Sequence, residues 1–214
     1  MILADCGNTA VKLAYGAERV RLPPGQVAAW LASHPADRLL LLPGASAAAE
    51  VVRRAWRGPL TEIGRDLQLP DRGQYAGIGV DRIVAGLAAG AATIVVDAGT
   101  ATTLTAWNAD CRFSGGLILP GAHALIAGLC ARAPALPMVE PLGRDAPAAQ
   151  RDTRGAIAAG AGIGHAAMVE ACLARLRLET RIDRVLITGG GAEVLDLPEA
   201  ESRPWLVLEG MELV

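Results

Sequence analysis

The chain has 214 residues, of which 52% are hydrophobic and 20% are charged, and its formal net charge is −2. So much apolar material excludes a disordered chain and allows one domain or two small ones. The small net charge argues against a protein that binds nucleic acid or a membrane surface by bulk electrostatics, so we expect neither partner. Lys12 is the single lysine among 20 basic residues.

The cysteines and the apolar segments indicate a reduced, cytoplasmic protein. The four cysteines, at positions 6, 111, 130 and 172, form no C-x-x-C pair and have no accompanying histidine cluster. A zinc site or a disulfide framework is therefore not expected. Residues 1–5 show no basic segment of a signal peptide. Residues 113–131 contain no Asp, Glu, Lys or Arg. Their glycines and their Pro-Gly pair predict a strand, a turn and a helix rather than a membrane span.

The first half of the chain predicts a three-stranded antiparallel meander followed by alternating helices and strands. Short apolar runs separated by glycine and asparagine turns are typical of such a meander. We expect strands over 1–5, 11–15, 18–22, 39–42 and 60–63, and helices over 26–33 and 46–56. The order is therefore βββαβαβ, which is an α/β arrangement.

The second half repeats this order after one linking helix, expected over 81–92. We expect strands over 93–97, 102–108, 112–119, 184–188 and 206–209, and helices over 121–132, 153–177 and from 191. The repeat predicts two domains, residues 1–78 and 79–214. A duplicated fold of this kind implies a cleft between its halves.

The repeat is also visible in the residues that end the first strand of each half. Ile2–Thr9 parallels Val95–Thr102, because each has an apolar strand, an aspartate, one intervening residue, a glycine, and then hydroxyl side chains. Glycine lets the backbone approach a ligand, and free N–H groups suit phosphate oxygens. The aspartate would act on phosphate through a cation. One such loop could be an ordinary strand-ending turn, whereas two matched loops favour a site for a nucleoside triphosphate and metal ions.

Two further segments carry polar chemistry. Thr188–Gly191 is a glycine cluster between a strand and a helix, which permits close approach of a base or ribose but is weak alone. Gly79–Arg82 opens the linking helix. Asp81 could simply complement the helix dipole beside a solvated Arg82. Alternatively, Asp81 could accept a proton from an attacking hydroxyl while Arg82 holds a substrate carboxylate.

Seven segments appear together in the order typical of one family. They are Asp5-Cys6-Gly7-Asn8-Thr9 with Lys12, Gly79-Val80-Asp81-Arg82, Asp97-Ala98-Gly99-Thr100-Ala101, Gly115-Gly116-x-Ile118-x-Pro120-Gly121, Ala133-Pro134-Ala135-Leu136-Pro137, Thr153-x-x-Ala156-Ile157-x-x-Gly160, and Leu186-x-Thr188-Gly189-Gly190. No segment is specific alone, but the ordered set is. The chain resembles the type III pantothenate kinases of the acetate-and-sugar-kinase/Hsp70/actin superfamily.

The resemblance implies a fold and an activity. The fold would be α/β, with duplicated actin-like/ribonuclease H-like βββαβαβ domains and an interdomain nucleotide cleft. The activity would be ATP-dependent phosphorylation of pantothenate to 4'-phosphopantothenate, the first step of coenzyme A biosynthesis. It would need Mg²⁺ and a monovalent cation, K⁺ or NH₄⁺, in a homodimer. The alternatives are a non-catalytic nucleotide-binding regulatory protein on the same fold, or another small-molecule kinase of the superfamily.

The resemblance also implies roles for individual residues. Asp81 would be the catalytic base. The pantothenate-binding residues would be Gly79, Val80, Asp81, Arg82, Thr153 and Tyr75. The ATP-binding residues would be Asp5, Cys6, Gly7, Asn8, Thr9, Ala10, Val11, Lys12, Thr100, Gly189 and Gly190. Asp97 would hold the monovalent cation, and Asp5 would hold Mg²⁺ through water.

Overall fold

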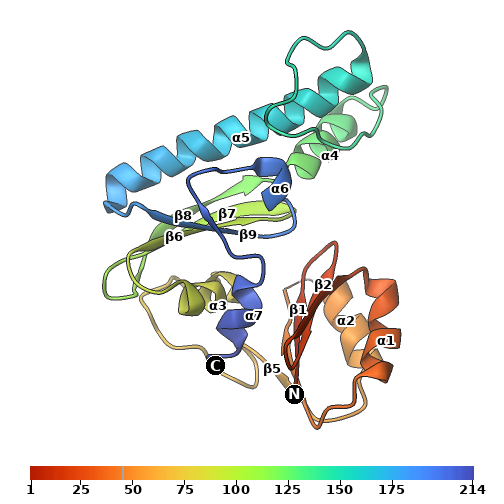
Figure 1. Cartoon of the computed structure of the whole chain (residues 1–214), viewed down its shortest axis with the longest axis vertical. Helices are drawn as coiled ribbons and strands as arrows, with labels where there is room; N and C mark the ends of the chain where they lie inside the picture. The colour runs from red at the N-terminus through yellow and green to blue at the C-terminus, as the bar shows by residue number, and fades with distance from the viewer. Residues whose placement is uncertain (45) are drawn as a thin grey trace. The chain divides into compact units, whose positions relative to one another are not determined.

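The computed structural model describes residues 1–44 and 46–214, with the side chain of Ser46 left aside. These residues divide into two compact units, each with its own sheet. Unit 1 comprises Met1–Gly90 and Trp205–Val214, and unit 2 comprises Ala91–Pro204. Figure 1 shows the chain entering the second unit after helix α3 (Val80–Ala89) and returning to the first for its last helix, α7 (Leu206–Met211).

Unit 1 is built on a five-stranded mixed sheet in the order β3-β2-β1-β4-β5. Its strands are β1 (Ile2–Cys6), β2 (Val11–Tyr15), β3 (Glu18–Leu22), β4 (Leu39–Leu42) and β5 (Leu60–Glu62). The first three strands pair antiparallel, while β4 and β5 run parallel to β1. The predicted meander and the two later strands are thus confirmed.

Helices cover both faces of this first sheet. Alternate residues of β1, Ile2, Ala4 and Cys6, are fully buried in a core with α1 (Pro24–Ser33) and α2 (Ser46–Ala55). Figure 1 shows these two helices side by side on one face of β1 and β2. Because strand side chains alternate between faces, Leu3 and Asp5 belong to the other face. Helix α7 packs against β1 and β2, and α3 packs against α7.

The end of the chain differs from the prediction. We expected a strand over 206–209, but Leu206–Met211 is helix α7, and the strand lies earlier as β10 (Glu201–Ser202). A short apolar run of this kind is ambiguous between strand and helix, and packing decides it. Gly210 settles the packing here, because a Cβ atom at that position would overlap the carbonyl oxygen of Val84 on α3.

The linking helix groups with the N-terminal residues by compactness, since α3 packs against α7 within unit 1. The prediction placed a boundary at residue 79 because the repeated strand order begins after this helix. The boundary of the repeat and the boundary of the compact unit therefore describe different properties of the chain, and the division 1–78 and 79–214 stays a prediction.

Unit 2 repeats the sheet of unit 1. Its strands are β6 (Thr93–Ala98), β7 (Ala101–Trp107), β8 (Phe113–Pro120), β9 (Arg184–Thr188) and β10. Their order is β10-β9-β6-β7-β8, with β7 and β8 antiparallel and β9 parallel to β6. Read from the other edge, β8-β7-β6-β9-β10 is the order of unit 1 with each strand replaced by its counterpart. The duplicated α/β fold is therefore confirmed.

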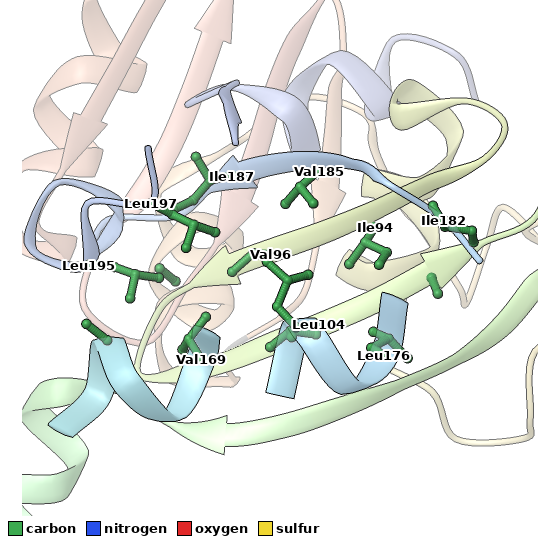
Figure 2. Packing of buried hydrophobic residues seen from close by; sticks show 14 residues of the cluster. Ile94, Val96, Leu104, Val169, Leu176, Ile182, Val185, Ile187, Leu195 and Leu197 are labelled. Carbon is green, nitrogen blue, oxygen red and sulfur yellow. The ribbon is translucent and has the colours of Figure 1, made fainter. Parts of the chain in front are cut away.

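The core of unit 2 lies between one face of its sheet and helix α5 (Thr153–Thr180). Figure 2 shows Val96 and Leu104 directed toward the α5 segment that carries Val169, and Ile187 of β9 beside Leu197 in the same cluster. The short helix α6 (Ala192–Leu195) packs against β6 and α5. Helix α4 (Ala122–Arg132) lies beside the N-terminal part of α5, which extends past the sheet in Figure 1.

Helix α5 is long and apolar enough to cross a membrane by length and composition alone. Half of its most apolar window is buried within the protein. Ala166, Val169, Leu173 and Leu176 lie in the core of unit 2. This packing is that of the core helix of a globular domain, whose buried face needs the same apolar residues.

Candidate functional site

The loop after β1 closes tightly around Gly7. The N–H of Gly7 donates to the carbonyl oxygen of Ala10 at 3.1 Å, which turns the chain into β2. Asp5 and Lys12 stand opposite each other in the β1–β2 register, and both are half-buried. Gly7, Asn8 and Thr9 are exposed. The loop therefore presents backbone and hydroxyl groups next to a carboxylate and an ammonium, as a phosphate-binding loop requires.

The loop after β6 is similar but shorter. The N–H of Gly99 donates to the carbonyl oxygen of Ala101 at 3.1 Å, and Gly99 and Thr100 are exposed. Asp97 ends the strand in the position that Asp5 holds on β1 and is likewise half-buried. The two loops matched in the sequence thus occupy equivalent places in their sheets, and each is closed by the N–H of its glycine. The bond spans three residues in the first loop and two in the second.

Glycines that follow other strands of the two sheets leave space for these loops. A Cβ atom at Gly44 would lie 2.8 Å from the carbonyl oxygen of Cys6, and one at Gly121 would overlap that of Gly99. Gly189 has φ of +94°, and a Cβ atom there would overlap both Asp97 Oδ1 and the carbonyl oxygen of Ala98. From the sequence, Gly121 is expected in a turn, but neither Gly121 nor Gly44 is assigned a role in making room for these loops. The Pro-Gly pairs at 43–44 and 120–121 are the sequence feature that marks both positions.

The start of α3 gathers three of the predicted substrate residues. Arg82 is 6% exposed, and its Nη1 donates a hydrogen bond of 3.0 Å to the hydroxyl of Tyr75, which is 50% exposed. The Asp81 carboxylate lies over Gly79, because a Cβ atom on that glycine would overlap Asp81 Oδ1. The half-buried Asp81 thus lies in the first turn of a helix, and the next residue in sequence is an arginine that is hydrogen-bonded to a tyrosine hydroxyl. This arrangement offers a proton acceptor next to an anion-binding group.

Thr153 lies elsewhere, at the first position of α5 in unit 2. Asp152 caps the helix by accepting a hydrogen bond of 2.9 Å from the N–H of Gly155. The exposed Thr153 lines an open, mostly apolar groove of about 650 Å³ between α4 and α5. Ile126, Leu129 and Ile157 are among its other lining residues.

Two buried groups near these loops are uncharged. Burial raises the pKa of the Cys6 thiol to about 12, and the neighbouring Asp5 adds to the shift. Burial lowers the pKa of His165, whose Nε2 shares a hydrogen bond of 2.8 Å with the Thr102 hydroxyl. Both groups therefore stay neutral near pH 7. Cys6 acts as a small apolar residue of the core, and His165 fastens α5 to β7.

No group of three or more His, Cys, Asp or Glu side chains able to hold a metal ion occurs in residues 1–44 and 46–214. A hydrated Mg²⁺ needs only one or two carboxylates together with substrate phosphates. The carboxylates of Asp5 and Asp97, each beside a glycine loop, fit that mode of binding.

Two α/β units of the same strand order, each with an aspartate and a glycine loop at the end of its first strand, define the duplicated actin-like fold. A Campylobacter jejuni protein named for the Baf family of transcriptional activators shares this fold, with a TM-score of 0.66, 19% identity, and coverage of 100% of this chain and 96% of that one.

The sequence profile of the type III pantothenate kinases matches residues 43–175. A type III pantothenate kinase of Synechococcus elongatus is 34% identical over 69% of this chain and 64% of its own length. Another, from Desulfovibrio desulfuricans, is 32% identical over 90% of this chain and 86% of its own length. The chain therefore belongs to the type III pantothenate kinase family.

Several matches to this family are partial. The matched regions cover 46% to 64% of the length of four of the curated relatives. This chain therefore spans roughly half to two thirds of the length of those relatives.

Proposed function

We propose that the protein phosphorylates pantothenate with ATP to give 4'-phosphopantothenate, the first step of coenzyme A synthesis, in the cytoplasm. The observation that carries the proposal is the grouping of Asp81, Arg82 and Tyr75 at the start of α3. A protein that only bound a nucleotide would need the two glycine loops but not this group. Family membership supports pantothenate as the acceptor.

In the proposed reaction, the hydroxyl of pantothenate attacks the γ-phosphorus of ATP, and the bond from that phosphorus to ADP breaks. Asp81 orients the hydroxyl and takes its proton late, since a loose transition state leaves the attacking oxygen protonated until then. Arg82 binds the pantothenate carboxylate, and Tyr75 holds the guanidinium in place. The positions of these side chains support this assignment of roles.

The phosphates are proposed to bind along residues 5–12, with Thr100, Gly189 and Gly190 completing the ATP site. Lys12 places a compact positive charge opposite Asp5, which suits phosphate oxygens. Asp5 holds Mg²⁺ through water, and Asp97 holds a monovalent cation, K⁺ or NH₄⁺. The bound cations supply neutralisation of charge on the transferring phosphoryl group.

The proposal includes a homodimer with Thr153 contributing to pantothenate binding. Thr153 lines the groove between α4 and α5, where Leu129 is 44% exposed. An open apolar groove of this kind is typical of an interface. Sedimentation or light scattering at assay concentration would give twice the chain mass, whereas a monomer with full activity would contradict this part of the proposal.

The assay for the proposed function measures ADP release with ATP and Mg²⁺, with and without pantothenate, in potassium, ammonium or sodium buffer. We expect release that depends on pantothenate and is faster in potassium or ammonium. Release without pantothenate would favour another kinase of the superfamily. Binding of ATP with no release would favour a regulatory nucleotide-binding protein.

Replacing the single lysine tests the phosphate loop. We expect Lys12→Arg to lower kcat/KM for ATP by about tenfold to a hundredfold, because a broad guanidinium replaces a compact ammonium beside charged groups. The KM for pantothenate should change little. Steady-state kinetics and a melting curve measure both effects. Arg21→Lys is the matched control, since Arg21 faces Lys12 on the next strand; equal losses in both variants would contradict the role of Lys12.

The Tyr75 hydroxyl tests the substrate pocket. Tyr75→Phe removes the acceptor of the Arg82 hydrogen bond, so we expect KM for pantothenate to rise about fivefold to tenfold, the value of one hydrogen bond. KM for ATP should stay unchanged. The control is Tyr15→Phe, which removes a hydroxyl that donates to the carbonyl oxygen of Pro35 at 2.8 Å. An unchanged pantothenate KM in Tyr75→Phe would show that this pair does not orient Arg82 for substrate.

A further inference from the structure

Glu62, the last residue of β5, is the one buried carboxylate among residues 1–44 and 46–214, and it is 7% exposed. Taking a carboxylate out of water costs free energy that only charged or hydrogen-bonding partners offset. A buried ion pair adds little net stability compared with apolar side chains of similar volume, which leaves the fixing of local geometry as its contribution. The proposed reaction assigns no role to Glu62.

Two arginines hold the Glu62 carboxylate. Arg53, in the last turn of α2, donates to Glu62 Oε2 from Nη2 at 2.8 Å and from Nε at 3.3 Å. Arg65 Nη1 lies 3.3 Å from the same oxygen. Arg65 also donates two hydrogen bonds of 2.9 Å to Asp66, which lower the pKa of that carboxyl to about 2. These two acids and two arginines form one charged group, the Glu62 cluster.

The Glu62 cluster closes the loop of residues 62–67 that follows β5. The carbonyl oxygen of Glu62 accepts hydrogen bonds from the N–H groups of Arg65, Asp66 and Leu67 at 3.3, 2.8 and 3.2 Å. The N–H of Glu62 donates to Asp66 Oδ2 at 2.9 Å, and that of Gly64 donates to the carbonyl oxygen of Leu67 at 2.8 Å. Both the backbone and the side chain of Glu62 therefore hold this loop.

Gly64, within this loop, lies against the start of α3. Its φ is +89°, and a Cβ atom built there would lie 3.3 Å from Val80 Cγ1 and 3.8 Å from Val80 Cγ2. The glycine thus lets the loop backbone approach Val80 closely. Val80 is the first residue of α3 and directly precedes Asp81, the proposed base. The loop held by Glu62 therefore supports the turn that carries Asp81.

We infer that Glu62 is a positioning residue of the pantothenate site. Its ion pairs with Arg53 and Arg65 fix the loop of residues 62–67, and Gly64 in that loop fixes Val80 and the first turn of α3. The inference rests on the proposed function for the identity of the substrate, whereas the support of α3 by the loop is a property of unit 1 alone. A displacement of about 1 Å in a group that orients a substrate can lower the rate about a hundredfold.

Glu62→Gln tests the inference by removing the charge that both arginines share. We expect kcat/KM for pantothenate to fall about tenfold to a hundredfold, because the first turn of α3 shifts. KM for ATP should change little. Glu50→Gln is the matched control, since Glu50 also pairs with Arg53, at 3.7 Å, but from within α2 rather than from the loop. Its kinetics should match those of the wild type, and equal losses in the two variants would overturn the inference.

Two glycine variants separate positioning from stability. Alanine is strained at a positive φ, so Gly64→Ala and Gly16→Ala, where φ is +57°, should both lower the melting temperature. Nothing lies within 4 Å of a Cβ atom at Gly16, whereas one at Gly64 meets Val80. Only Gly64→Ala should therefore lower kcat/KM for pantothenate, by about tenfold.

Hydrogen exchange without substrates reports on α3 independently of turnover. The N–H groups of Arg82 and Ile83 donate to the carbonyl oxygen of Gly79 at 3.1 and 3.4 Å. We expect the peptide covering residues 78–84 to exchange faster in Glu62→Gln and Gly64→Ala than in the wild type and the two controls, because a turn that loses its support opens more readily.

Unchanged exchange in both variants, or unchanged pantothenate kinetics in both, would overturn the inference. A wild-type protein that fails to phosphorylate pantothenate would refute the proposed function. Faster exchange at residues 78–84 in such a protein would still show that the Glu62 cluster holds the start of α3.

Discussion

Asp81→Asn is expected to lower kcat by a factor on the order of 10² to 10⁴, the usual contribution of a positioned general base. Asparagine keeps the shape of the side chain over Gly79 but cannot take the proton of the attacking hydroxyl. The KM values should change much less than kcat. Asp81 lies in the first turn of α3, so losing its charge should cost less than about 1 kcal/mol of helix stabilisation. Kinetics of the purified variant, with its melting curve, provide the measurement.

The matched control for this variant is Asp110→Asn. Asp110 is exposed in the turn between β7 and β8, where its N–H donates to Asn108 Oδ1 at 3.0 Å. It belongs to none of the proposed sites, so its loss of charge should leave kcat unchanged. Near-wild-type turnover of a folded Asp81→Asn protein would contradict the role of Asp81.

Gly210→Ala is expected to destabilise unit 1 by about 3 kcal/mol, at the upper end of what one added methyl group costs in a packed core. The added Cβ would overlap the carbonyl oxygen of Val84 and lie 2.9 Å from its Cγ1. Backbone cannot move aside as a flexible side chain can, so α7 must shift away from α3. The loss would be measured by chemical or thermal unfolding.

Gly128→Ala serves as the control for the glycine substitution. Gly128 lies within α4, and nothing lies within 4 Å of a Cβ atom built there. Alanine should therefore stabilise this helix by about 0.5–1 kcal/mol. If both variants had the same stability as the wild type, the close packing of α3 and α7 would not hold in solution.

Much of the fold could be predicted because each half follows simple local rules. The turns around Gly7 and Gly99 separate short apolar strands, and the same aspartate-glycine pattern appears twice. The order of strands then followed from the repeat. The pairing of β1 with β4, and of β6 with β9, joins segments far apart in the chain, and no sequence pattern predicted it.

The parts that the sequence did not reveal depend on tertiary contacts. Leu206–Met211 is a helix because it packs against α3, which no local pattern shows. The Arg82–Tyr75 hydrogen bond joins residues seven positions apart across a loop and a helix start. The pairing of Asp97 with Thr103 on one neighbouring strand and with Thr188 on the other is evident only once the register of the three strands is known. The sequence identifies the individual residues, but it does not show which residues contact them in the folded protein.

The lysine noted in the composition gains a definite setting in the structure. Lys12 stands opposite Asp5 on the strand that follows the proposed phosphate loop, while the equivalent position of the other unit is Thr103. The two halves therefore share a strand order but differ in the side chain opposite the aspartate, which is a lysine in one and a threonine in the other.

Identifying the phosphorylated product tests the central claim most directly. The protein is incubated with ATP, Mg²⁺, potassium and pantothenate, and the products are analysed by mass spectrometry. We predict pantothenate that has gained one phosphoryl group, in an amount equal to the ADP formed, and a greatly reduced yield with Asp81→Asn. ADP formed with no phosphorylated pantothenate, or equal yields from the two proteins, would contradict the account.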